Sequence, residues 1–253
     1  MSFLLPVTLI LFLLVTMFVS ARIGERTRVR DERDHPGEAN DIAAMEAAIL
    51  GLMGLLLAFT FTESTERTAE RRALVVREIA SIETVYNRAA LLDDEPRQAL
   101  TGHVRRYAEL HAALEGEADE AAQLGLIEES RKQEAHIWSL VTTVVRANPE
   151  MADVLVDSTN EMFAVVTERL AMLRRPAQVA VFLLLGLLAW ASAYFAGYAV
   201  GAQPDKHRPH LIAFIVVTVM TIYLIVDMQY ARVGLIQVTD TIELYDTLLR
   251  DLR

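Results

Sequence analysis

Residues 43–92 read AAMEAAILGLMGLLLAFTFTESTERTAERRALVVREIASIETVYNRAALL, fifty residues without a proline. The first part is apolar apart from Glu46, and an α-helix needs about 20 such residues to cross the hydrocarbon layer of a bilayer. After Thr62 charged residues enter, while apolar residues recur three and four positions apart. The recurring positions are Val75, Ile79, Ile82, Tyr86 and Ala89. The stretch therefore predicts one long helix that begins as a membrane span and continues into water as an amphipathic helix.

Three other stretches are apolar enough to span a membrane. The four predicted spans cover residues 3–19, 42–62, 177–200 and 211–230. Val19-Ser20-Ala21 would suit a signal peptidase, but no basic residue precedes the first apolar run, so we expect a retained span. The sequence thus predicts a polytopic membrane protein and excludes both a simple soluble globule and a disordered chain.

The region between the second and third spans is charged and acidic. Residues 63–175 carry 14 Arg or Lys and 21 Asp or Glu, a net of −7 out of the −10 of the whole chain. Apolar residues recur there with a helical period, and no alternating run long enough for a strand occurs. The region predicts a water-facing bundle of helices, with breaks at Gly116 and Gly125.

The predicted fold class is all-α, with four transmembrane helices and an extramembrane helical bundle inserted between the second and third spans. The expected domains are residues 1–62 with the first two spans, 63–175 with the bundle, 176–231 with the third and fourth spans, and 232–253 with a C-terminal amphipathic helix. The apolar seam of that last helix consists of Val238, Ile242, Tyr245, Leu249 and Leu252.

Composition and motifs argue against several functions. The chain has no cysteine, which excludes disulfides and thiolate metal sites, and its acidity argues against nucleic-acid binding. His207 and His210 lie beside Lys206 and Arg208, a poor setting for a metal, and the other histidines are expected to be ordinary surface or core residues. No phosphate loop, nucleophile elbow or metalloprotease motif occurs, so we expect no metal, no cofactor and no enzymatic activity.

The charges around the spans nearly balance between two orientations. The loops after the first span and before the fourth contain basic residues, which favour the cytoplasmic side. These residues are Arg22, Arg26, Arg28, Arg30, Arg33, Lys206 and Arg208. Basic residues also flank the spans on the opposite side, and the comparison leans toward a periplasmic bundle.

Two of the predicted spans carry stripes of small residues at helical spacing. The second span has Ala43, Ala47, Gly51, Gly54, Ala58 and Thr62, and the third has Ala189, Ala193, Gly197 and Gly201. Small residues at this spacing let helix backbones approach closely within lipid. The stripes predict helix packing within or between subunits, and alternatively a slim pore-lining or gating helix.

Aromatic, polar and acidic residues follow one another at the exit of the second span. The pore-lining or gating candidates are Phe59, Thr60, Phe61, Thr62, Glu63 and Glu66. In a symmetric oligomer the phenylalanines would form an apolar constriction, and the threonines and glutamates would form polar rings that favour cations. The alternative is an interfacial aromatic belt followed by solvated helix.

Two ionisable residues fall within predicted spans, Glu46 in the second and Asp227 in the fourth. Such groups by default suggest an ion path or a proton relay. Both lie near span ends, so the alternative places each in the headgroup zone. We expect them at opposite sides of the membrane and not paired with each other.

Four short motifs resemble a known family. They are GLLLAFTFT at 54–62, RRALVVRE at 71–78, YNRAALL at 86–92 and DMQYARVGLIQVT at 227–239. Together they resemble the bestrophin-like family of bacterial and plant membrane proteins over nearly the whole chain. The family's tail motif usually has an Arg-Pro pair where this chain has Tyr230 and Ala231, and an arginine where it has Gln237.

The resemblance implies an oligomeric ion channel of a bacterial inner membrane. Bestrophins are pentameric anion channels with four spans per subunit, a pore-lining second span and a cytosolic helical domain between the second and third spans. The resemblance thus favours a pentamer and a cytosolic bundle, in conflict with the orientation that the charges favour. The leading hypothesis is a channel whose partners are lipid, ions and copies of the same chain. The alternative is a non-conducting membrane scaffold or sensor whose bundle binds a partner protein.

Overall fold

The computed structural model describes residues 4–34, 43–117, 119–173, 179–201, 204–229 and 239–252, and these ranges contain helices and no strand. The α-helices are α1 (Leu4–Asp34), α2 (Ala43–Arg88), α3 (Asp94–Gly116), α4 (Glu120–Ala147), α5 (Ala152–Leu173), α6 (Val179–Gly201), α7 (Pro204–Gln229) and α8 (Thr239–Asp251). Short 3₁₀ helices occupy Ala89–Leu91 and Pro149–Met151. The chain is therefore all-α, as the sequence predicts.

The chain divides into two compact units. Unit 1 comprises Met1–Thr68 and Pro176–Ile236, and unit 2 comprises Ala69–Arg175 and Gln237–Arg253. Helix α2 contributes its first part to unit 1 and its second part to unit 2. The tail motif at 227–239 and the seam residue Val238 lie largely or wholly outside the described residues.

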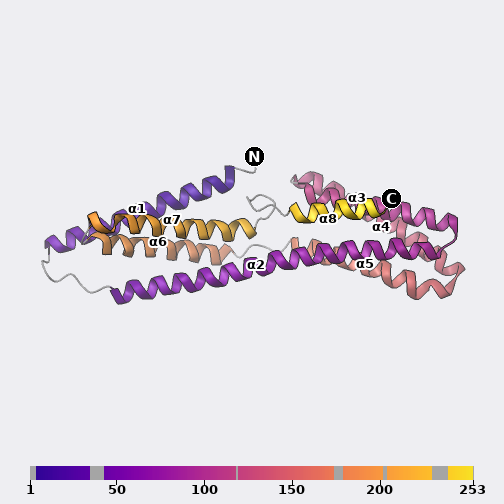
Figure 1. The fold of residues 1–253 in the computed structure, drawn as a ribbon, viewed down its shortest axis with the longest axis horizontal. Coiled ribbons are helices and arrows are strands. Elements are labelled where there is room, and N and C mark those ends of the chain that lie inside the picture. Colours follow the sequence, from indigo (N-terminus) through magenta and orange to yellow (C-terminus); the bar gives the residue numbers. More distant parts are fainter. Residues whose placement is uncertain are drawn as a thin grey trace. The chain divides into compact units, whose positions relative to one another are not determined.

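Unit 1 contains helices long and apolar enough to cross a membrane. The candidate spans lie within Val7–Asp34, Ala44–Leu91, Ala180–Gly201 and Arg208–Met228, which confirms the four spans expected from sequence. Helix α1 packs against α6 and α7, and α6 also packs against α7 (Figure 1). The core between them includes Met17, Leu185, Ala189, Ala193, Ile215 and Val219.

Helix α1 is longer than the sequence predicts. The arginine-rich segment after the first span, expected as a loop, is helical as far as Asp34. It is held to α6 and α7 by polar contacts: Tyr198 donates to Asp31 at 3.0 Å, and Arg208 pairs with Glu25 at 2.8 Å. The expectation of a loop was wrong because these partners come from the far end of the sequence.

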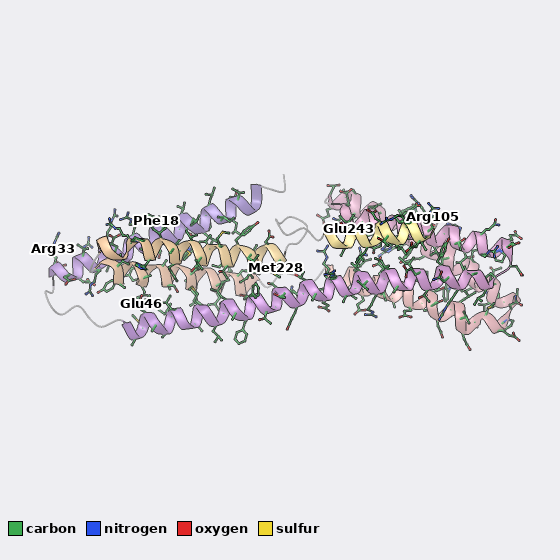
Figure 2. The ribbon with its side chains drawn as sticks, viewed as in Figure 1. Phe18, Arg33, Glu46, Arg105, Met228 and Glu243 are labelled. Atoms are coloured by element: carbon green, nitrogen blue, oxygen red, sulfur yellow. The ribbon has the colours of Figure 1, made fainter. Side chains whose placement is uncertain are left out.

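Helix α2 is a single helix of 46 residues, about 69 Å long at 1.5 Å per residue. It ends within four residues of the end predicted from sequence, and a 3₁₀ turn completes the stretch. Figure 2 shows Glu46 near the start of this helix and Phe18 midway along α1. The absence of proline from the stretch explains why the helix continues without a break.

Unit 2 is a helical bundle around an apolar core. Helix α3 packs against α4 and α8, and α4 packs against α5. The core includes Val75, Ile82, Leu100, Val104, Tyr107, Ile137, Leu155, Met162 and Leu248. Helix α3 ends at Gly116 as expected, but α4 continues through Gly125, so the predicted break there was wrong. Asp119 caps α4 by accepting from the Ala122 N–H at 2.9 Å.

Candidate functional site

The first part of α2 exposes a wide face to its surroundings. On the other side of the helix Met53 and Thr60 are each 5% exposed. Within residues 44–66 the exposed positions include Ala47, Gly51, Leu52, Gly54, Leu55, Ala58, Phe59, Phe61, Thr62 and Glu66. We call this set the exposed face of α2. Apolar side chains that a single chain leaves uncovered over several turns are available to lipid or to a further protein surface.

Two parallel stripes run along the exposed face. One is the small-residue stripe, Ala47, Gly51, Gly54 and Ala58. The other is the large-residue stripe, Leu52, Leu55, Phe59, Thr62 and Glu66, with spacings of three and four throughout. A helix with 3.6 residues per turn sets these two stripes side by side. A Cβ atom placed on Gly51 or Gly54 would meet none of the described atoms within 4 Å.

Phe59 and Phe61 point in different directions. Both are exposed, at 64% and 41%, but residues two apart on an α-helix project about 160° from each other. Because α2 is continuous here, the two rings cannot both face one axis. Phe59 belongs to the large-residue stripe, whereas Phe61 lies at the opposite edge of the exposed face.

The threonines at the end of the span are bonded to their own helix. Thr62 donates its hydroxyl hydrogen to the Ala58 carbonyl at 3.0 Å, and Thr60, which is buried, donates to the Leu56 carbonyl at 2.8 Å. Only lone pairs of the Thr62 hydroxyl oxygen remain to face outward, and these can accept a hydrogen bond or coordinate a cation.

The two glutamates beyond the span differ in pairing. Glu63 is half-buried and forms a salt bridge with Arg67 at 2.9 Å, one helical turn away. Glu66 is exposed and forms no salt bridge with a described residue. Glu66 is therefore the carboxylate of this segment whose charge is not offset by a paired arginine.

The small residues of α6 are in close contact with α1. A Cβ placed on Gly197 would lie 2.0 Å from the Ala21 carbonyl oxygen, and one placed on Gly24 would lie 2.0 Å from the Tyr194 carbonyl oxygen. Ala189 and Ala193 are fully buried in the same core. Trp190 bonds to Thr16 and Ser20 near the middle of α1, whereas Gly201 lies against Glu25 and Arg28 further along it, so α1 and α6 run parallel. Sequence analysis missed Gly24, which stands alone in a charged stretch and gives no periodic signal.

The ionisable residues within the spans have unlike surroundings. Asp227 is 3% exposed and accepts a hydrogen bond from Tyr223 at 2.8 Å, one turn away on α7. Glu46 lies in the first turn of α2 and is half-buried. The structure gives no contact between the two.

Unit 2 contains a buried polar cluster that sequence analysis missed. Arg169 of α5 is 2% exposed and donates to Glu78 of α2 at 2.6 Å and to Glu115 of α3 at 3.1 Å. Tyr245 of α8 donates to Glu78 at 2.6 Å. Burial disfavours the charge of Arg169, but these three partners raise its pKa above the usual value, so it stays a cation.

The cluster extends on both sides. Glu115 also accepts from Arg71 at 3.0 Å and from Thr241 at 3.1 Å. His111 has Nδ1 2.9 Å from a Glu78 oxygen, in poor alignment for a hydrogen bond, and Nε2 2.7 Å from Ser130 Oγ. Removing one partner of a buried ion network costs about 3–5 kcal/mol, so the cluster fixes α2, α3, α5 and α8 to one another.

The histidines and carboxylates do not form a metal site within the described ranges, where no three of them gather. His103 stacks on His136 with ring centroids 5.2 Å apart, and its Nδ1 lies 2.9 Å from Gln133. Lys206 and His207, which the sequence analysis judged a poor setting for a metal, have side chains outside the described set.

The four apolar helices and the polar bundle define a polytopic, all-helical membrane protein. The sequence profile of the Bestrophin-like domain matches residues 7–242. The chain belongs to this bestrophin-like family, and the family points to bestrophins, which are known as ion channels rather than enzymes.

Solved structures show the same fold at low sequence identity. One variant of a bacterial bestrophin homologue from Klebsiella pneumoniae is 14% identical, with a TM-score of 0.74 over 96% of this chain and 97% of that chain. Another variant of it is 13% identical, with a TM-score of 0.75 over 97% of this chain and 96% of that chain. Among curated proteins, none matches this sequence.

Proposed function

We propose that the chain forms an oligomeric ion channel in a bacterial inner membrane, with α2 lining the pore. The observation that carries this proposal is the exposed face of α2. Gly51 and Gly54 face no other described atom, and a threonine and an unpaired glutamate follow them on the same face. A helix that contacted only lipid would not require this combination. Family membership supports the proposal, and by resemblance the oligomer is a pentamer.

The two stripes of the exposed face would have different roles, one in contact between subunits and the other in lining the pore. The small-residue stripe allows a neighbouring subunit to approach the α2 backbone, since Gly51 and Gly54 add no side chain between the helices. The large-residue stripe, one position further round the helix, then faces the axis of the ring. This arrangement makes Gly51 and Gly54 contact residues and Phe59 a pore residue.

The pore lining follows from the order of the large-residue stripe. Leu52, Leu55 and Phe59 would form successive apolar rings, which gate by excluding water. Thr62 and Glu66 would form the polar mouth, and the uncompensated carboxylates of Glu66 favour cations. Thr60, which is buried, and Phe61, which points elsewhere, are not placed on this lining.

The test is a matched pair of alanine variants in liposome flux assays. Phe59→Ala removes an aromatic ring from the proposed constriction and is expected to raise ion flux severalfold, as the apolar barrier shortens. Phe61→Ala removes the same ring two positions away and should leave flux unchanged. Equal effects of the two variants would contradict the assignment of the axis.

The alternative of a non-conducting scaffold or sensor is separated by the wild-type protein. A ring-shaped oligomer that passes ions supports the channel. A monomer without flux would favour the scaffold.

The side of the membrane that holds the bundle is a separate question. Because the chain has no cysteine, Lys132→Cys, at an exposed position on α4, provides a single labelling site. Labelling of intact spheroplasts by a membrane-impermeant maleimide would place the bundle in the periplasm, as the charges favour. Labelling only after lysis would place it in the cytosol, as in bestrophins.

A further inference from the structure

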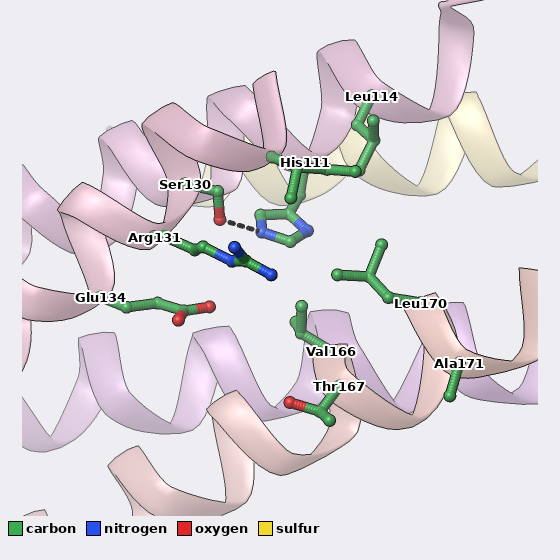
Figure 3. Close-up of a pocket in the computed structure, with 10 residues that line it drawn as sticks. His111, Leu114, Ser130, Arg131, Glu134, Val166, Thr167, Leu170 and Ala171 are labelled. Carbon is green, nitrogen blue, oxygen red and sulfur yellow. Dashed lines mark hydrogen bonds between the residues drawn. The ribbon is translucent and has the colours of Figure 1, made fainter. Parts of the chain in front are cut away.

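A cavity of about 440 Å³ opens between α3, α4 and α5 in unit 2 (Figure 3). Its lining residues are His111, Leu114, Ile127, Ser130, Arg131, Glu134, Val166, Thr167, Leu170 and Ala171. Pockets of about 300–1,000 Å³ are the usual size for small organic ligands. The cavity lies within one unit and does not involve the exposed face of α2.

The lining has an apolar part and a polar part. Leucine, isoleucine, valine and alanine side chains from all three helices provide the apolar surface. The polar groups come mainly from one stretch of α4, where Ser130, Arg131 and Glu134 face the cavity, with His111 opposite on α3 (Figure 3). A fitting ligand therefore has an apolar body and a polar group at one end.

Arg131 provides an available positive charge. It is exposed and forms no salt bridge or hydrogen bond with another described side chain. A guanidinium binds a carboxylate through two parallel hydrogen bonds, which are stronger than bonds between neutral groups.

Glu134 does not oppose an incoming anion fully. It is partly buried, and its oxygen accepts a hydrogen bond from the Tyr107 hydroxyl at 3.2 Å. Burial raises the pKa of Glu134, although the Tyr107 hydrogen bond and the nearby His111 and Arg131 act in the opposite direction. Arg131 and Glu134 carry opposite formal charges, but Glu134 already has a hydrogen-bond partner in Tyr107 whereas the Arg131 guanidinium has none among the described residues, so the open position in the lining is one for a carboxylate.

Ser130 adds a hydroxyl next to Arg131. Its Oγ lies 2.7 Å from Nε2 of His111, and when that nitrogen carries hydrogen the hydroxyl is free to donate to a ligand. Ser130 lies inside α4, where the helix uses the backbone N–H groups, so an oxyanion hole of the kind that hydrolases use is not formed here. The chemistry of the cavity is thus binding rather than acyl transfer.

We propose that this cavity binds a small monocarboxylate with an apolar body, such as an arylalkanoate, with Arg131 and Ser130 holding the carboxylate and the leucine, isoleucine and valine side chains covering the body. The proposal does not depend on ion conduction, since binding is measured directly.

The test is calorimetric titration of the full chain in lipid nanodiscs with phenylbutyrate. Phenylbutanol and phenylbutylamine have the same body with a neutral and a positive end. We expect each to bind about tenfold more weakly or worse, because a hydrogen bond to a charged group contributes roughly 1.5–3 kcal/mol. Equal binding of the acid and the alcohol, or no binding of the acid, would overturn the proposal.

Two neighbouring variants localise the binding. Arg131→Gln should weaken phenylbutyrate binding about tenfold or more while binding of phenylbutanol stays the same. Lys132→Gln is the matched control, because Lys132 is the adjacent exposed cation, pairs with Glu129 at 3.2 Å and does not line the cavity. An unchanged melting temperature shows that each variant folds. Full affinity in Arg131→Gln, or equal losses in both variants, would contradict the site.

Discussion

Helices α6 and α2 both carry small residues at spacings of three and four, yet their surroundings differ. On α6, Gly197 lies so close to the Ala21 carbonyl that no side chain fits. On α2, Gly54 faces open space within the described chain. The spacing of small residues determines how closely another helix can approach. Which helix packs there depends on other parts of the chain or on another subunit.

The largest loss of stability is expected from a substitution that disrupts the α1–α6 contact. Gly197→Leu places a side chain against the backbone of α1, and overpacking of a fixed contact costs about 1–3 kcal/mol or more. We expect the melting temperature in detergent to fall by several degrees and the yield of folded protein to drop. Gly186→Leu on the same helix is the control, since a Cβ there meets no described atom within 4 Å. Similar melting temperatures for both variants would show that α1 and α6 are not in contact.

The next effect concerns assembly rather than folding. Gly54→Leu adds a side chain on the exposed face of α2, where one chain has room for it. If that stripe contacts a neighbouring subunit, the oligomer weakens by about 1–3 kcal/mol per interface while the subunit stays folded. Light scattering measures the mass, and circular dichroism the fold. An oligomer as stable as the wild type would place this stripe against lipid. Gly102→Leu, in the bundle and equally open, is the control.

A smaller effect sharpens the description of the α1–α6 contact. Ser20 donates to the Trp190 carbonyl at 2.8 Å, and Trp190 Nε1 donates to Thr16 at 3.1 Å. Ser20→Ala removes one of these interhelical bonds and should cost about 0.5–1.5 kcal/mol of unfolding free energy, measured by denaturant titration in micelles. A double variant with Thr16→Val tests whether the two bonds act together. A stabilised Ser20→Ala would mean that the bond does not form.

The smallest effect concerns the polar end of the same helices. Arg208 pairs with Glu25 at 2.8 Å, but its side chain is about half exposed, so Arg208→Gln should cost only about 0.2–1 kcal/mol. The loss should shrink further in concentrated salt, because ions screen an exposed charge pair. A loss independent of salt would show that Arg208 acts by packing. Arg26→Gln, at an exposed cation of α1 that forms no salt bridge with a described residue, is the control and should leave the free energy of unfolding unchanged.

Sequence patterns predicted the helices better than their contacts. The four spans and the long α2 were predictable, because apolar length and the absence of proline act within one segment. The helical course of α1 to Asp34 was not, since Tyr198 and Arg208 hold it from α6 and α7. The Gly125 break failed for a related reason: a single glycine costs about 1 kcal/mol, which the rest of α4 overcomes.

Some candidate functional residues were likewise predictable from sequence and others were not. The stripe of α2 was visible from spacing, but only helix geometry separates the directions of Phe59 and Phe61, and only the structure shows that Thr60 is buried within one chain. The cluster around Arg169 was not visible, because its members come from separate helices and each resembles an ordinary flanking charge. The cavity beside Arg131 was hidden for the same reason.

The contact of Gly24 and Gly197 has a mechanical consequence. Two helices whose backbones are in contact cannot slide or turn past each other without separating first. Helices α1 and α6 therefore behave as one rigid pair. Any conformational change within unit 1 must then move other elements relative to this rigid pair. Helix α2 is covered on one side near Met53 and Thr60 and exposed on the other, and its second part is fixed in unit 2 through Glu78.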